Sequence, residues 1–297
     1  MQKVSILHLI TAAKNASPFD VNMAYDAGFE KIMPYTNVAL DEVAALTQDA
    51  IFSRSPSGVK LEALFIGGRD IHLALTMQQA AKSAMFTPFE MSTFADPSGA
   101  FTTAAAMLAK IDALLKKNQQ TLAAQTIAIF GASGTVGSTA ALIAASLGAN
   151  VQLVAHKELA QMHEYAADLQ ATYGVNLQVV DGDNDAKKTQ ILQTATVAIC
   201  AAAAGVRVLE PAHFNASKTL SIVADVNAVA PSGAAGVDVM SDGQLIADTQ
   251  ISALGALAIG QLKYKTQQTM LQQMLNKEHP EHLDYNHAFD IARAILS

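Results

Sequence analysis

The 297-residue sequence predicts an α/β protein with two domains, each an open and mostly parallel sheet covered by helices. Three observations support this: strand-like apolar runs alternate with helical patterns, the connections are short, and one polar stretch, residues 116–121, interrupts the alternation. That stretch predicts a first domain over residues 1–117 and a second over 118–269. We expect the C-terminal helices, residues 270–297, to fold back onto the first domain, which would form an interdomain cleft.

The elements of the first domain follow from periodicity and capping signals. Ser17 is a good N-cap, Pro18 suits the first helical position, and Gly28 can end that helix. Strands are expected over 5–10, 31–35, 63–66 and 91–95. Helices are expected after Ser17, over 39–50, from Asp70 and over 98–117.

The second domain opens on the most informative stretch, residues 126–157. An apolar run leads into a turn with three glycines, Gly131, Gly134 and Gly137, and an Ala-rich helix and a second apolar run follow. Such a unit places the pyrophosphate of a dinucleotide at a helix N-terminus. Gly131 would allow the tight turn, and Gly134 would let the backbone approach the phosphate oxygens. Gly137 would let the helix pack closely on the strand. A packing turn without a ligand is the alternative interpretation.

The remaining elements continue the Rossmann-type pattern of the second domain. Strands are expected near 176–180, 197–202 and 220–225, and a loop rich in glycine and proline over 228–236. A long helix follows Leu254, and a C-terminal helix is expected over 285–296.

The end of the second strand of the glycine-turn unit bears on the choice of nucleotide. NAD-specific sites usually carry a carboxylate there, which accepts from the ribose 2′-hydroxyl. Here the strand ends in His156 and Lys157, which would attract a 2′-phosphate, so NADP is favoured. Glu158 could turn inward, so NAD stays plausible. Lys157 could also be an ordinary solvated lysine.

Composition excludes several classes of function. A net charge of −7 without a basic run argues against a nucleic-acid partner. The single cysteine, Cys200, rules out disulfides within the chain. The sequence contains no hydrolase nucleophile motif and no spaced histidines or paired cysteines, so no metal is expected. The apolar run after Lys3 is too short for a secretory signal, and no run approaches a membrane span. We therefore expect a cytoplasmic protein with no membrane partner.

Two strand-to-helix junctions carry polar side chains that could take part in chemistry. After the first strand, capping by Ser17 would leave Asp20 spare at the mouth of a strand, where ligands usually bind. After the fourth strand, capping by Ser98 would leave Thr102 and Thr103 without a structural need.

A third cluster begins the long C-terminal helix. Gly255 and Gly260 would permit close approach of a flat ring or of another helix. Lys263 follows them and is either a surface lysine or a functional one.

Six segments together closely resemble the NAD(P)-dependent methylene-tetrahydromethanopterin dehydrogenases of methylotrophic bacteria. They are SPFDVNMAYDAGF (17–29), PYT (34–36), LTQDAIFSR (46–54), FADPSGAFTT (94–103), ADVNA (224–228) and GALAIG (255–260). The resemblance covers essentially the whole chain, and the glycine turn is a variant that keeps all three glycines. It implies oxidation of methylene-tetrahydromethanopterin to the methenyl form, a step of formaldehyde oxidation. It also implies a homo-oligomer, a trimer or a hexamer.

The resemblance also implies the site residues. The pterin is expected in the cleft near Asp20, Thr102 and Lys263, of which Asp20 and Lys263 are the candidate catalytic residues. Candidate substrate contacts are Phe19, Asn22, Phe101, Thr102 and Thr103. Candidate cofactor contacts are Gly131, Ser133, Gly134, Thr135, Val136, Gly137, His156, Lys157, Ala203, Asp225, Asn227, Gly255 and Leu257. His156-Lys157 stands where strictly NADP-dependent members carry Arg-Lys, so both cofactors remain open.

The small number of candidate catalytic side chains suits this chemistry. Removing hydride from a carbon between two nitrogens leaves a delocalised cation, and no proton has to move in that step. The protein must position the carbon and stabilise positive charge, and Asp20 could do the latter. Alternatives are a dehydrogenase of methylene-tetrahydrofolate or of a hydroxy acid, and a sensor that binds NADP without turnover.

Overall fold

The computed structural model describes residues 4–276 and 278–297, and this part of the chain forms two compact units. The first extends to Thr102 and includes Tyr264–Ile291, and the second comprises Thr103–Lys263 and Ala292–Ser297. Residues 1–3, where a secretory signal would begin, lie outside the described residues.

The division falls near the start of helix α5 (Ala100–Lys117), not in the polar stretch that follows this helix. The reason lies in what the helix contacts. Lys110 Nζ forms an ion pair of 2.8 Å with Asp242 Oδ1, and Leu114 packs against Gly243, both in the second unit. Most of α5 therefore belongs to the second unit.

The first unit contains a five-stranded, all-parallel sheet in the order β12-β4-β3-β1-β2. Its strands are β1 (Ile6–Ile10), β2 (Lys31–Tyr35), β3 (Glu62–Ile66), β4 (Ser92–Ala95) and β12 (His282–Leu283). The four strands predicted from the sequence are confirmed. The short strand β12 was not predicted, because two residues carry no periodic pattern, and its pairing with β4 depends on the chain returning to this sheet.

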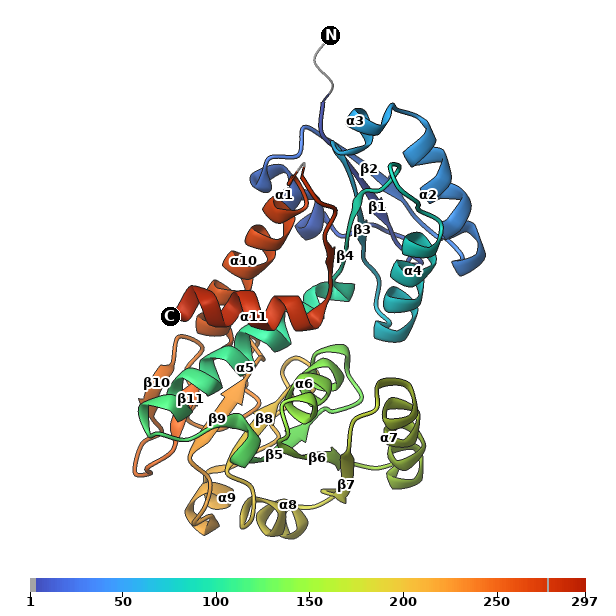
Figure 1. Cartoon of the computed structure of the whole chain (residues 1–297). Coiled ribbons are helices and arrows are strands. Elements are labelled where there is room, and N and C mark those ends of the chain that lie inside the picture. The colour runs from blue at the N-terminus through green and yellow to red at the C-terminus, as the bar shows by residue number, and fades with distance from the viewer. Residues whose placement is uncertain (1–3, 277) are drawn as a thin grey trace. The chain divides into compact units, whose positions relative to one another are not determined.

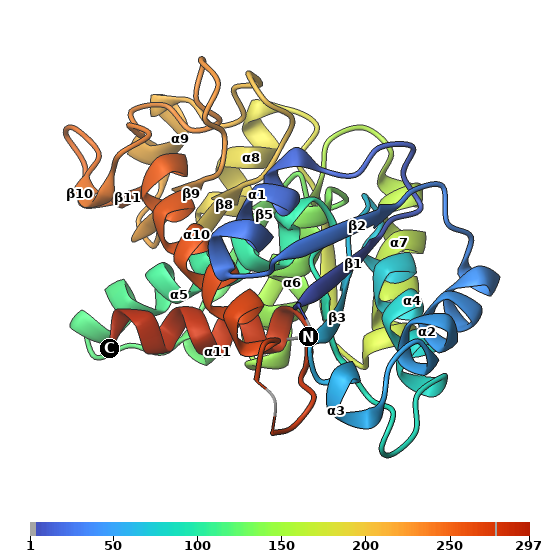
Figure 2. The same cartoon turned by 90° about the horizontal axis from the view of Figure 1, so that it is seen from above.

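Helices cover both faces of the first sheet (Figure 1). They are α1 (Pro18–Ala27), α2 (Val43–Phe52), α3 (Pro56–Val59) and α4 (Ile71–Ser83). Figure 2 shows α1 on one side of the sheet and α2 and α4 on the other. Right-handed crossovers explain this arrangement, because the chain moves one way from β1 to β2 and the opposite way from β2 to β3 and β4. The strand order therefore reverses between β1 and β3.

The second unit contains a seven-stranded sheet in the order β10-β11-β9-β8-β5-β6-β7. Its strands are β5 (Thr126–Phe130), β6 (Asn150–Ala155), β7 (Leu177–Asp181), β8 (Val197–Cys200), β9 (Ile222–Asp225), β10 (Asp242–Leu245) and β11 (Ser252–Leu254). All pairs are parallel except β10 with β11, so the prediction of a mostly parallel sheet is confirmed. Cys200 is buried at the end of β8, and burial raises the pKa of its thiol.

The helices of the second unit again lie on two faces (Figure 1). They are α6 (Thr135–Ser146), α7 (Leu159–Tyr173), α8 (Asp185–Leu192) and α9 (Pro211–Ala216), together with most of α5. Helices α10 (Ala256–Gln273) and α11 (Tyr285–Leu296) are each divided between the two units. The order of this sheet reverses between β5 and β8, so the loops after these two strands form the crevice where α/β sheets bind ligands. None of the described helices is both long and apolar enough to cross a membrane.

Candidate active site

The turn after β5 is a strand-to-helix turn in which two positions, Gly131 and Gly137, require glycine. Gly131 has a φ of +80°, and a Cβ there would collide with the carbonyl oxygen of Ala201 in the loop after β8. A Cβ on Gly137 would collide with the carbonyl oxygen of Gly131. The predicted roles of Gly131 in a tight turn and of Gly137 in close packing are thus confirmed.

Gly134 is the N-cap residue of α6, and Thr135 and Val136 open the helix. Ser133 and Gly134 are exposed, and the first turn of any α-helix leaves backbone N–H groups without partners in the helix. These N–H groups and the positive end of the helix dipole suit a phosphate. The exposed Ala203 follows β8, whose loop meets the glycine turn through Ala201. This geometry fits a dinucleotide pyrophosphate.

A pocket of about 530 Å³ extends from the end of β6 to α7. Its lining residues are Ser133, Ala155, His156, Lys157, Glu158, Gln161, Met162 and Tyr165. His156 and Lys157 are exposed, and neither forms an ion pair within residues 4–276 and 278–297. Tyr165 OH lies 2.5 Å from Ser138 Oγ, which also donates to the carbonyl of Ala132 in the glycine turn. The pocket thus joins the glycine turn to the two basic residues.

Asp225 and Asn227 organise the loop after β9. Asp225 is buried and its carboxylate accepts from the backbone N–H groups of Asn227 (2.9 Å) and Ala234 (3.0 Å). Burial raises the pKa of this carboxyl. Asn227 Nδ2 donates to the carbonyl of Pro231 (3.0 Å). These polar groups therefore hold the loop in shape, and sequence reasoning did not anticipate that role.

Gly255 and Leu257 stand where the chain enters α10. A Cβ on Gly255 would collide with the carbonyl oxygen of Asp238, so the backbone of residues 238–239 needs a glycine here. Leu257 is 47% exposed, with its N–H bonded to the carbonyl of Val239. The side chain of Leu257 is thus available to a ligand.

In the first unit, Asp20 lies at the start of α1 with only 5% of its surface exposed. Ser17 Oγ accepts from the N–H of Asp20, which confirms the predicted cap. Gln267 Nε2 donates to Asp20 Oδ1 at 3.2 Å, and a Cβ on Gly67 would lie 3.8 Å from Asp20 Oδ2. A carboxylate is thus held between α1, α10 and the turn after β3. Sequence reasoning missed Gln267, although it stands one helical turn after Lys263.

The prediction that Ser98 caps the following helix is wrong. Asp96 caps it instead: its Oδ1 accepts from the N–H groups of Phe101 (2.9 Å) and Thr102 (3.2 Å), and its Oδ2 accepts from Thr102 Oγ1 (2.7 Å). The two oxygens of a carboxylate can satisfy several donors at once, which one hydroxyl cannot. Ser98 has a φ of +55° and donates to the carbonyl of Gly68 at 2.8 Å. Thr102 therefore has the structural role that the sequence did not assign to it.

The other candidate substrate residues lie in different environments. Phe19 is 48% exposed and Asn22 is exposed, both on α1. Phe101 is fully buried and packs edge-on against Tyr285, with ring centroids 5.4 Å apart, and Thr103 is half-buried. Lys263 is 9% exposed on α10, so it is not an ordinary surface lysine.

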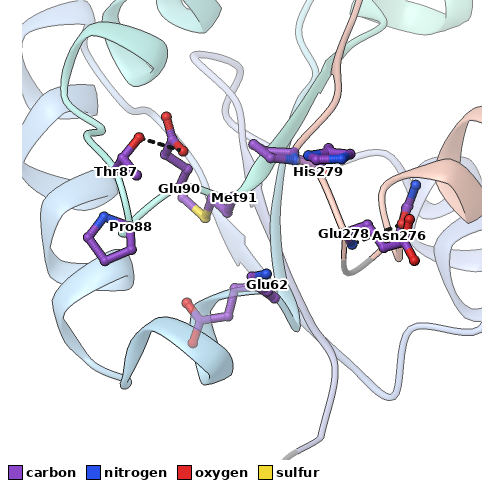
Figure 3. A pocket seen from close by; sticks show the side chains of 11 residues that line it. Glu62, Thr87, Pro88, Glu90, Met91, Asn276, Glu278 and His279 are labelled. Atoms are coloured by element: carbon purple, nitrogen blue, oxygen red, sulfur yellow. Dashed lines mark hydrogen bonds between the residues drawn. The ribbon is translucent and has the colours of Figure 1, made fainter.

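A separate pocket lies at the opposite end of the first sheet, at the amino ends of β3 and β4 (Figure 3). Glu62, Glu90, Glu278 and His279 are among its lining residues. Glu62 is already paired with Arg54 at 2.7 Å, and Glu90 accepts from Thr87. Ligands of parallel α/β sheets bind at the carboxyl ends. No group of acidic, histidine or cysteine side chains among the described residues is arranged to hold a metal ion.

Comparison with known sequences gives consistent matches. Residues 18–98 match the family model described as "Methylene-tetrahydromethanopterin dehydrogenase, N-terminal". The chain is 41% identical over 289 residues, 97% of each chain, to the NAD(P)-dependent methylenetetrahydromethanopterin dehydrogenase of Methylorubrum extorquens. It is 30% identical, over 84% of each chain, to the protein of the same organism named Bifunctional protein MdtA.

Two solved structures share the fold at low sequence identity. Ornithine carbamoyltransferase from Gloeobacter violaceus has a TM-score of 0.55 at 12% identity, with 92% of this chain and 87% of that one covered. Shikimate 5-dehydrogenase from Listeria monocytogenes, in complex with shikimate and NAD, has a TM-score of 0.53 at 14% identity, with 99% and 96% covered. At these identities the likeness supports the α/β fold alone.

Proposed function

This chain belongs to the methylene-tetrahydromethanopterin dehydrogenase family, and we propose that it oxidises methylene-tetrahydromethanopterin to the methenyl form with NAD(P)⁺ as hydride acceptor. The observation that carries this proposal is a likeness at 41% identity that extends over 97% of the chain. The reaction is a step of one-carbon oxidation. Its requirements are a dinucleotide site, a pterin site and stabilisation of one positive charge.

The hydride-transfer step balances without acid or base. A C–H bond of the methylene bridge breaks, its electron pair leaves with the hydrogen to nicotinamide C4, and the remaining carbon shares a positive charge with two nitrogens. We assign to Asp20 the stabilisation of that developing charge, because a nearly buried carboxylate interacts strongly with a cation in a medium of low dielectric.

Two neighbours prepare Asp20 for this role. The amide of Gln267 holds Oδ1, which restricts rotation of the carboxylate. A Cβ on Gly67 would lie 3.8 Å from Oδ2, so the backbone of the turn after β3 approaches the second oxygen. Lys263 is assigned to orient the pterin, since a cation cannot stabilise a second developing cation.

For the dinucleotide, we assign the pyrophosphate to the glycine turn and the N-terminus of α6. Lys157 and His156 are assigned to the 2′-phosphate of NADP, because both face the pocket at the end of β6 and are unpaired among the described residues. NAD lacks this phosphate, so it would bind with fewer contacts. NADP is therefore the proposed preferred acceptor and NAD a second one.

An absorbance assay for the methenyl product tests the proposal. Purified protein is offered methylene-tetrahydromethanopterin or methylene-tetrahydrofolate, each with NADP⁺ or NAD⁺. Turnover with the first substrate supports the proposal, and turnover with the folate alone would assign the chain to the alternative dehydrogenase class. NADP binding without any turnover would indicate a sensor. The homo-oligomer and the cytoplasmic location stay predictions.

A further inference from the structure

A second pocket of the first unit has no role in the function described so far. It measures about 290 Å³ and lies at the carboxyl ends of β1 and β3. Alanines, glycines, Leu73 and Met77 line it, and Arg69 and Asp70 are its charged lining residues. Its surface is therefore largely apolar with charge at two adjacent positions.

The position of this pocket in the sheet favours a ligand. The strand order of the first sheet reverses between β1 and β3, and open α/β sheets bind ligands at such points. The turn after β3 is held in place there: the N–H of Gly67 donates to the carbonyl of Ile10 (2.9 Å), and Ser98 Oγ donates to the carbonyl of Gly68 (2.8 Å). Gly68 has a φ of +127°. The pocket is thus bounded by a fixed turn whose first two residues, Gly67 and Gly68, carry no side chains.

The pocket adjoins the carboxylate to which we assign charge stabilisation. Gly67 lines the pocket, and a Cβ on Gly67 would lie 3.8 Å from Asp20 Oδ2. Gly67 is therefore the residue that the lining of this pocket and the surroundings of Asp20 have in common.

Of the two charged residues in the lining, Arg69 is available to a ligand. It is exposed and forms no hydrogen bond or ion pair with any residue in the described ranges. Asp70 is engaged, because its Oδ1 accepts from the N–H of Leu73 (2.9 Å) as the N-cap of α4. A guanidinium group binds a carboxylate or phosphate through two parallel hydrogen bonds, so an anion is its natural partner.

We propose that this pocket binds the arylamine side chain of the reduced pterin, and that Arg69 pairs with an anionic group farther along that side chain. This inference rests on the proposed function. The reacting carbon bridges the pterin ring and the arylamine nitrogen, so an aromatic ring stands directly next to it. A flat apolar ring suits a lining of alanine, glycine, leucine and methionine. Arg69 then acts as a specificity-determining residue that selects substrates with an anionic tail.

The Arg69→Gln variant of the whole chain tests whether the positive charge of Arg69 binds the anionic group. It is assayed with methylene-tetrahydromethanopterin and with a methylene-bridged pterin that ends at the aryl ring. We expect kcat/KM for the full substrate to fall ten-fold or more and kcat/KM for the tail-less compound to stay unchanged. Arg69→Lys should recover part of the loss. The matched control is Lys82→Gln, which removes an exposed cation at the other end of α4 and should change neither value.

Two results of the Arg69→Gln assay would overturn the assignment: an equal loss for both substrates, or no loss for either. Binding of NADP, measured by fluorescence titration, should be the same in all variants.

Ala13→Leu tests the pocket itself, since Ala13 is half-buried in its lining. A leucine there should raise KM for both substrates, because both carry the aryl ring, while the melting temperature stays within a few degrees of the wild type. Unchanged KM values would place the aryl ring elsewhere.

Turnover by the wild-type protein distinguishes failure of the proposed function from failure of this inference. An inactive wild type overturns the proposed function, whereas an active wild type with unaffected variants overturns this inference alone.

Discussion

The side-chain amide of Gln267 donates a hydrogen bond of 3.2 Å to the carboxylate of Asp20, although 247 residues separate them in the sequence. Both side chains are buried, Gln267 completely and Asp20 to all but 5% of its surface. An amide neighbour orients a carboxylate without neutralising it. Gln267 therefore restricts the orientation of this carboxylate, and our proposal needs a carboxylate of fixed orientation beside the carbon that becomes cationic.

Asp20→Asn should lower kcat on the order of 10²- to 10³-fold, because it preserves shape and removes the charge that matters as hydride leaves. NADP affinity should be nearly unchanged. The kcat and the melting temperature are measured on the same sample. A variant that melts earlier but turns over normally would show that Asp20 serves only the structure of α1.

Gly134→Asp should abolish dinucleotide binding while leaving the fold intact. The backbone of Gly134, with φ −75° and ψ 157°, lies in a region open to every residue type, and aspartate is a favoured N-cap residue. A Cβ there would lie 3.3 Å from the carbonyl oxygen of Gly131, which has to shift by a few tenths of an ångström. Its carboxylate would, however, face the pyrophosphate. Fluorescence titration with NADPH measures the loss, and circular dichroism together with Gly134→Ala provides the control. Wild-type affinity in the aspartate variant would move the dinucleotide away from this turn.

Lys157→Ala should reduce kcat/KM for NADP roughly ten-fold or more with little effect on NAD, because a charge-assisted hydrogen bond contributes about 1.5–3 kcal/mol. Lys157→Arg should retain the preference. The two cofactors are compared in steady-state kinetics at one pterin concentration. Equal losses with NAD and NADP would mean that Lys157 does not contact the 2′-phosphate.

His287 should make stability depend on pH. Its hydrogen bond to Asp284, 2.8 Å between Nδ1 and Oδ1, raises the pKa of the imidazole above its ordinary value. A histidine with a raised folded-state pKa stabilises the native protein below its unfolded-state pKa, and that contribution is lost as pH rises through the folded-state value. The contribution of His287 to the free energy of unfolding should therefore fall as pH rises above about 6.5.

Urea unfolding at a series of pH values measures this effect. His287→Gln should make the change in the free energy of unfolding between pH 6 and 8 less negative than in the wild type, and His163→Gln, which alters an exposed histidine on α7, should not change it. The same slope in His287→Gln as in the wild type would assign the pH dependence to other groups.

The sequence alone determined the features that depend on residues close to one another along the chain. Apolar runs predicted the long parallel strands, because a strand buried on both faces must be apolar along its length. Ser17 and Pro18 predicted the start of α1, and the spacing of Gly131 and Gly137 predicted a turn in which no Cβ fits. Each of these follows from the local geometry of a few consecutive residues.

Only the tertiary structure decided which distant residues meet. Asp96, and not Ser98, caps α5, because the turn places Ser98 at φ +55° against the carbonyl of Gly68. Strand β12 exists because the returning chain pairs with β4, and Gln267 reaches Asp20 because α10 lies alongside α1. Local periodicity carries no information on such contacts, since they depend on the path of the whole chain and on the free energy of burying polar groups together with their partners.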